Sequence, residues 1–186
     1  MNTAGKQLRI LFIGNSHTYK NCLPEVLKDI AAKDGIDVIP AMIAHGGWSL
    51  EKHCGEPEAA CNIRLGRYDY VVLQEHTHPF AERCEYLGAV KRLDEMIRAA
   101  HARTVIYMTW AAKKAPENQA EITALQTESA SVTGALLANV GEQLWQQSPE
   151  FINGFFAPDG EHPSAQGTAF AAGIIWDVIR EDMGKL

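Results

Sequence analysis

Apolar residues fall along this chain in short continuous runs that alternate with segments of helical periodicity. Four runs rich in β-branched or aromatic residues predict buried strands, at residues 8–14, 37–44, 68–74 and 104–110. A fifth run, at residues 135–141, is weaker because its alanines and leucines suit a helix equally well. Continuous apolar runs of this length are typical of strands that are covered on both faces.

Between the strands, apolar residues recur every three or four positions and so share one face of a helix. This spacing predicts helices at residues 23–31, 87–97 and 165–182, and the polar stretch 117–131 is also helix-prone. The alternation predicts a three-layer α/β/α sandwich with a central parallel sheet of about five strands. Ligands of such sheets bind beyond the carboxyl ends of the strands, so we expect functional residues to follow strands.

Length and composition narrow the class of protein. The 186 residues, with no repeat or Pro/Gly-rich linker, predict a single domain spanning residues 1–186. Hydrophobic residues make up 46% and charged residues 22%, values typical of globular proteins. The formal net charge of −6, without any run of Lys or Arg, argues against nucleic acid or an anionic membrane surface as a partner.

The chain has neither a membrane-spanning nor a signal-like apolar stretch. We therefore expect a soluble protein, cytoplasmic as the sequence is written, although an exported protein that had been trimmed would look the same. The four cysteines lack C-x-x-C spacing, so free thiols are the default. A local disulfide between Cys54 and Cys61 stays open as an alternative.

The first chemical signal follows the first predicted strand, where residues 14–18 read GNSHT. Ser16 thus lies between a strand and a helix, a position that exposes a nucleophile and aims backbone N–H groups at a developing oxyanion. The alternative is that Ser16 or Thr18 only shapes the turn and caps the helix.

The second signal is Asp159 and His162, on a predicted loop before the last helix. An aspartate three residues before a histidine can accept the Nδ1 proton of the imidazole, which leaves Nε2 free as a general base. A solvated aspartate followed by a surface histidine, with Pro163 marking the first helical turn, explains the pair as well.

Taken together, the blocks GNS at 14–16, HGGWS at 45–49 and DGEHPSAQG at 159–167 resemble those of the SGNH (GDSL-like) hydrolase family. The resemblance covers nearly the whole chain. It implies a flavodoxin-like α/β fold, a serine esterase activity and no cofactor or metal.

By this resemblance Ser16 is the nucleophile, and Asp159 and His162 complete a catalytic triad. The first block departs from the GDSL pattern at two positions, because Asn15 replaces an aspartate and His17 replaces a leucine. Neither departure touches a residue with a triad role.

The resemblance also implies an oxyanion hole made by the N–H groups of Ser16 and Gly47, with the neighbouring Gly46 as the alternative register. The third block of the family, G-x-N-D, is missing, and the chain reads VVLQEHTHP at 71–79. By similarity to carbohydrate esterases with a Gln-containing third block, Gln74 is the candidate for the remaining donor.

Substrate preference follows from the same resemblance. A small domain without an evident lid favours a short acyl group, and the carbohydrate-esterase branch suggests acetyl on a sugar. Trp48 and Trp110 are candidates for the walls of the substrate pocket, although aromatic residues at strand ends are often core. If catalysis has been lost, the same two residues and Tyr19 would stack on sugars in an inactive carbohydrate-binding module.

A metal-dependent hydrolase is a further alternative, because His76 and His78 form an H-x-H directly after a predicted strand. The chain has no H-E-x-x-H, and the only acidic residue close to this pair is Glu75. The serine mechanism therefore remains the favoured interpretation.

Overall fold

The computed structural model describes residues 7–77 and 80–185. Within them, five strands form one sheet in the order β2-β1-β3-β4-β5, and all neighbouring strands are parallel. The strands are β1 (Gln7–Gly14), β2 (Asp37–Ala44), β3 (Tyr70–Leu73), β4 (Arg103–Tyr107) and β5 (Leu136–Ala138). The predicted α/β fold with a parallel sheet of five strands is confirmed.

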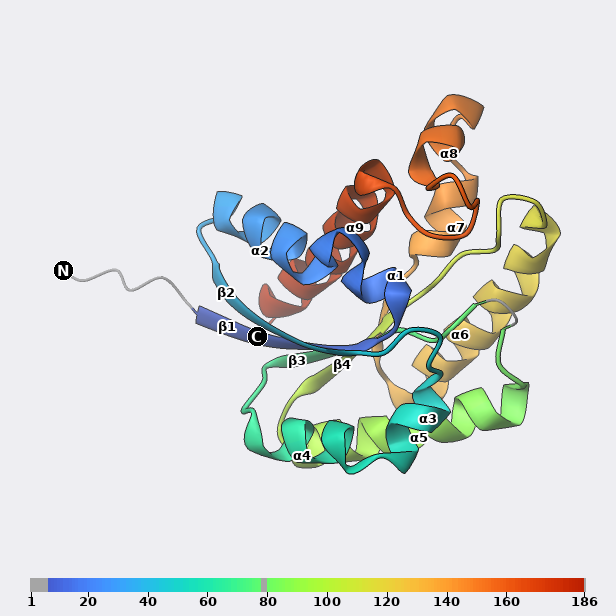
Figure 1. Cartoon of the computed structure of the whole chain (residues 1–186). Coiled ribbons are helices and arrows are strands. Elements are labelled where there is room, and N and C mark those ends of the chain that lie inside the picture. The colour runs from blue at the N-terminus through green and yellow to red at the C-terminus, as the bar shows by residue number, and fades with distance from the viewer. Residues whose placement is uncertain (1–6, 78–79, 186) are drawn as a thin grey trace.

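Helices cover both faces of this sheet (Figure 1). One face carries α2 (Leu23–Lys33), α7 (Val140–Trp145), α8 (Pro149–Phe155) and α9 (Ala165–Met183). The opposite face carries α3 (Leu50–Gly55), α4 (Pro57–Leu65), α5 (Arg83–Ala99) and α6 (Gln119–Thr133). The one-turn helix α1 (Ser16–Tyr19) lies at the carboxyl end of β1, and two 3-10 turns occupy Lys20–Cys22 and Pro116–Asn118.

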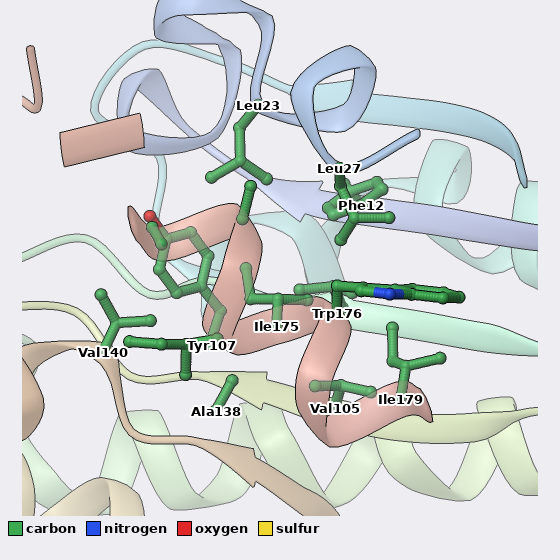
Figure 2. Close-up of a cluster of buried hydrophobic side chains, with 14 of the residues drawn as sticks. Phe12, Leu23, Leu27, Val105, Tyr107, Ala138, Val140, Ile175, Trp176 and Ile179 are labelled. Atoms are coloured by element: carbon green, nitrogen blue, oxygen red, sulfur yellow. The ribbon is translucent and has the colours of Figure 1, made fainter. Parts of the chain in front are cut away.

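Successive residues of each strand point to opposite faces, so a continuous apolar run fills two cores at once. In β1, Ile10 and Phe12 join the cluster beneath α2 and α9, whereas Leu11 and Ile13 join the cluster on the α5 face. Figure 2 shows the first cluster, with Phe12 and Trp176 among its labelled side chains. Burying each such side chain contributes about 1.5 to 3 kcal/mol, which explains why the strand pattern is readable in the sequence.

The element boundaries differ from the prediction where the chain leaves the sheet. Strands β3 and β4 end earlier than predicted, and residues 74–77 and 108–115 continue as loops above the carboxyl edge. The weak run 135–141 divides into a three-residue strand and the start of α7. Helices α3 and α4 were not predicted, because each has fewer than ten residues and so offers little periodicity.

All four cysteines are free thiols, so the Cys54–Cys61 disulfide is not formed in this structure. The Cys54 Sγ lies 3.5 Å from the Ala89 carbonyl oxygen, and burial raises the pKa of this thiol. Across residues 7–77 and 80–185, no helix has both the length and the apolar character that crossing a membrane requires.

Candidate active site

The turn after β1 is held by close packing and by buried hydrogen bonds. A Cβ atom at Gly14 would lie 2.5 Å from the Gln74 Oε1 and 2.6 Å from the Thr18 Oγ1, so only glycine fits there. The Asn15 side chain caps α1 by accepting a hydrogen bond of 3.1 Å from the His17 N–H. Ser16 therefore begins its helix from a fixed backbone position at the carboxyl edge of the sheet.

A chain of hydrogen bonds connects Ser16 to the loop that precedes α9. The Ser16 Oγ lies 2.8 Å from the His162 Nε2, and the His162 Nδ1 lies 2.8 Å from the Asp159 Oδ2. In the tautomer whose Nδ1 donates to the carboxylate, Nε2 carries a lone pair that can accept a hydrogen bond from the Ser16 hydroxyl. The structure thus brings together the three residues that the two sequence motifs single out.

The second oxygen of the Asp159 carboxylate is held by the backbone. Its Oδ1 accepts hydrogen bonds of 2.9 Å from the N–H groups of Glu161 and His162. Partial desolvation acts to raise the pKa of Asp159, but these two bonds and the His162 imidazole outweigh it and hold the pKa below its ordinary range. The carboxylate therefore stays ionised at neutral pH and keeps the imidazole in one tautomer.

The loop that carries His162 is hydrogen-bonded to residues of the segment that follows β4. The Trp110 Nε1 donates a hydrogen bond of 2.9 Å to the Glu161 carbonyl, and the Lys113 N–H donates one of 2.8 Å to the Gly160 carbonyl. The His17 ring packs between two other rings, with centroid distances of 5.0 Å to His162 and 5.1 Å to Trp110. The position of the His162 imidazole is thus fixed through its ring face as well as through Nδ1.

A hollow of about 240 Å³ opens directly beside the Ser16 hydroxyl. Its lining consists of Asn15, Ser16, His17, Gly47, His76, Thr77, Glu161 and His162. Gly47 has φ +71°, a conformation that favours glycine, and Asn15 ties this loop down with a hydrogen bond of 3.0 Å from Nδ2 to the Trp48 carbonyl. Among the described residues, no group accepts a hydrogen bond from the N–H of Ser16 or Gly47.

Gln74 occupies a different place from the one that an oxyanion donor requires. Its side chain is fully buried, and its Oε1 accepts hydrogen bonds of 2.9 Å from the Asn15 N–H and 2.8 Å from the Thr18 Oγ1. Its Nε2 donates to the Glu75 carbonyl at 2.6 Å. Both ends of the amide are therefore engaged within the protein, and Gln74 links the end of β3 to the turn after β1.

The two tryptophans expected to form pocket walls are not among the residues that line this hollow. Trp110 is fully buried and supports the loop of His162. Trp48 is half-buried, its ring centroid lies 4.2 Å from that of His45, and the Lys52 ammonium lies 4.5 Å above its ring. The exposed indole surface that sugar stacking requires is missing at Trp110.

The H-x-H pair is only partly visible, because His78 lies outside the described residues. His76 lines the hollow, and its Nδ1 lies 2.8 Å from the Glu75 Oε1. No group of three or more His, Cys, Asp or Glu side chains within residues 7–77 and 80–185 has an arrangement suited to a metal ion.

The sequence did not predict the contacts by which Asn15, His17 and the Glu75–His76 pair shape this site. For Asn15 the signal was available, because asparagine before a helix start is a frequent N-cap. For the other residues the roles depend on contacts between segments that are distant in sequence, which no local pattern carries.

Comparison with known proteins bears on the fold that carries this site. No protein-family model and no curated protein matches the sequence. Among solved structures, a proposed SGNH hydrolase from Slackia heliotrinireducens matches with a TM-score of 0.81 and 28% identity, over 94% of this chain and 100% of that one. The chain has the fold of the SGNH hydrolases.

Further solved structures match at lower identity and so bear on the fold alone. A variant of Axe2, an acetyl-xylooligosaccharide esterase from Geobacillus, has a TM-score of 0.69 at 15% identity and covers 96% of both chains. A carbohydrate esterase family 3 protein from Talaromyces cellulolyticus has a TM-score of 0.71 at 16% identity, over 96% of this chain and 99% of that one.

The buried hydrogen bonds of Gln74 generate a prediction about stability. Gln74→Ala leaves the buried Asn15 N–H without its acceptor, so the free energy of unfolding should fall by about 1 to 3 kcal/mol. Gln126→Ala is the matched control, since Gln126 is equally buried but its side chain makes one hydrogen bond, to Thr109. Urea titration of both variants measures the difference, and a smaller loss for Gln74→Ala than for Gln126→Ala would contradict the fastening role.

Proposed function

We propose that this protein is a serine esterase that removes a short acyl group, with acetyl on a carbohydrate as the leading substrate. The observation that carries the proposal is the continuous hydrogen-bond chain from Ser16 through His162 to Asp159, with distances of 2.8 Å at both links. A serine hydroxyl becomes a nucleophile when an oriented base accepts its proton.

In the first half of the reaction, the His162 Nε2 takes the Ser16 proton as Oγ bonds to the ester carbonyl carbon. The carbonyl oxygen becomes an oxyanion, which the unengaged N–H groups of Ser16 and Gly47 stabilise by hydrogen bonding. The imidazolium remains paired with Asp159. When the tetrahedral intermediate collapses, the C–O bond to the alcohol breaks and the proton on Nε2 passes to the leaving alcohol.

In the second half, water replaces the alcohol and returns the enzyme to its starting state. The His162 Nε2 accepts a proton from water while the water oxygen bonds to the acyl carbon. The bond between that carbon and the Ser16 Oγ then breaks, and the proton returns to the serine oxygen. The carboxylic acid is released without any change of oxidation state, so the residues present suffice for every step.

Two features support a short acyl group and a polar alcohol. The hollow beside Ser16 has about 240 Å³, which is below the range of about 300 to 1,000 Å³ usual for ligand pockets and so favours a small acyl group. A second hollow of about 420 Å³ shares Thr77 and Glu161 with it and is also lined by Lys114 and Glu121. The fold likeness to an acetyl-xylooligosaccharide esterase is consistent with a sugar in that polar space.

Ser16→Ala removes the proposed nucleophile and should abolish ester hydrolysis. The melting temperature should hardly move, because a half-exposed hydroxyl contributes little to stability. With the unaltered protein, kcat/KM on 4-nitrophenyl esters should fall from acetate through butyrate to octanoate. Full activity of the folded Ser16→Ala variant would overturn the proposal.

Asp159→Asn tests the orienting carboxylate. Turnover should fall by about 10⁴-fold, because the asparagine favours the wrong tautomer of His162. Adding Ser16→Ala to Asp159→Asn should cause little further loss, since the triad works as a unit. Asp177→Asn is the matched control, because this exposed aspartate of α9 bonds to no other described residue than Arg180. A multiplicative loss in the double variant would show that the residues act separately.

A further inference from the structure

A second carboxylate–imidazole pair faces the same hollow from the loop after β3. The Glu75 Oε1 accepts hydrogen bonds of 2.8 Å from both the backbone N–H and the Nδ1 of His76. The Glu75 Oε2 accepts one of 3.0 Å from the N–H of Leu50, the first residue of α3. The geometry repeats that of Asp159 and His162, with the same ring nitrogen held by a carboxylate.

Placing Glu75 in this position is costly, because its side chain is 1% exposed and a buried carboxylate loses several kcal/mol of hydration. Of the Lys and Arg side chains that the structure describes, none forms an ion pair with it. A neutral side chain could cap α3 as well. The carboxylate adds a strong acceptor for the His76 Nδ1 proton, which fixes both the orientation and the tautomer of that ring.

With Nδ1 donating to Glu75, the neutral His76 ring presents a lone pair at Nε2. His76 lines the hollow beside Ser16, and within residues 7–77 and 80–185 no group hydrogen-bonds to this nitrogen. A lone pair cannot stabilise an oxyanion, which has no proton to give. It can accept a hydrogen bond from a hydroxyl group.

An independent observation on the next residue points to the same kind of ligand. Thr77 is 95% buried, with 5% relative exposure, yet its Oγ1 has no hydrogen-bond partner among the described residues. Thr77 lines both the hollow beside Ser16 and the larger hollow that adjoins it. Buried hydroxyl groups are normally paired, so an unpaired one at the junction of two hollows suits a ligand that supplies the partner.

We propose that His76 and Thr77 together bind a hydroxyl group adjacent to the ester in the alcohol part of the substrate. The His76 Nε2 accepts a hydrogen bond from this substrate hydroxyl, and the Thr77 hydroxyl donates a hydrogen bond to its oxygen. Glu75 is the positioning residue that holds the imidazole for this contact. The protein is then selective for monoesters of vicinal diols and sugars over esters of simple alcohols, an inference that rests on the proposed esterase function.

A pair of esters that differ by one hydroxyl tests this selectivity. trans-2-Hydroxycyclohexyl acetate carries the neighbouring hydroxyl, and cyclohexyl acetate lacks it. The unaltered protein should show a kcat/KM at least roughly 10-fold higher for the hydroxylated ester, the effect of one or two hydrogen bonds made to substrate. 4-Nitrophenyl acetate serves as the reference for the acyl-transfer machinery.

Thr77→Val keeps the side-chain shape and removes only the unpaired hydroxyl, so folding should be unaffected. It should lower the ratio of kcat/KM on the hydroxylated ester to kcat/KM on cyclohexyl acetate by about 3- to 10-fold. His76→Phe should lower the same selectivity further. Thr127→Val, at an exposed position of α6 outside the lining of both hollows, is the control for the same change of side chain and should leave this ratio as it is in the unaltered protein.

The outcomes separate the inference from the proposed function on which it rests. Equal activity of the unaltered protein on the two cyclohexyl esters overturns the inference, as does retained selectivity in folded Thr77→Val. If His76→Phe lowers kcat/KM equally on all three esters, His76 acts in the acyl-transfer step, and this result also overturns the inference. Absence of hydrolysis of every ester, 4-nitrophenyl acetate included, contradicts the esterase proposal itself.

Discussion

The hydrogen bond between the Ser16 hydroxyl and the His162 Nε2 joins residues 146 positions apart, and the architecture of the site is built around it. Its 2.8 Å length requires that the end of β1 and the loop before α9 keep their relative position. On one side, Gln74 fastens the turn after β1 to β3 through the Asn15 N–H. On the other, the indole of Trp110 holds the loop of His162 through the Glu161 carbonyl.

Both links are hydrogen bonds, the first buried and the second partly buried, and each gives a directional constraint that apolar packing lacks. The sheet supplies the frame, since α2 and α9 pack together over β1 and so link the two ends of the chain. In the same frame, the loop after β3 lacks the G-x-N-D block of the SGNH hydrolases, whose fold the chain has. Where the G-x-N-D block is expected, Gln74 has a structural role and the Glu75–His76 pair faces the hollow.

Much of the fold could be predicted because its signal is local. Continuous apolar strands and helical spacing reflect the burial of single elements, and GNS and D-x-x-H are short motifs with direct chemical meaning. The direction of the Gln74 amide could not be predicted. A glutamine at the end of a strand can donate to an oxyanion, and it can equally well hydrogen-bond to the backbone of a neighbouring turn. The hydrogen bond from the Asn15 N–H to the Gln74 Oε1, between residues 59 positions apart, decides between them.

Trp110 illustrates the same limit. Its place at the end of a strand is compatible with a pocket wall or with the core, and burial beneath the loop of His162 depends on how β4 and α9 come together. Short elements such as α3 and α4 escape prediction for another reason, because six to nine residues hold too few turns to establish a period.

If His162 activates Ser16 as a nucleophile, a fluorophosphonate should label the Ser16 hydroxyl covalently. Peptide mass spectrometry after labelling should place one adduct on Ser16. The adduct should form at a far lower rate in the folded His162→Ala variant, and the labelled protein should lose its ester hydrolysis. Hydrolysis that persists in fully labelled protein, or labelling of another residue with Ser16 unmodified, would contradict the account.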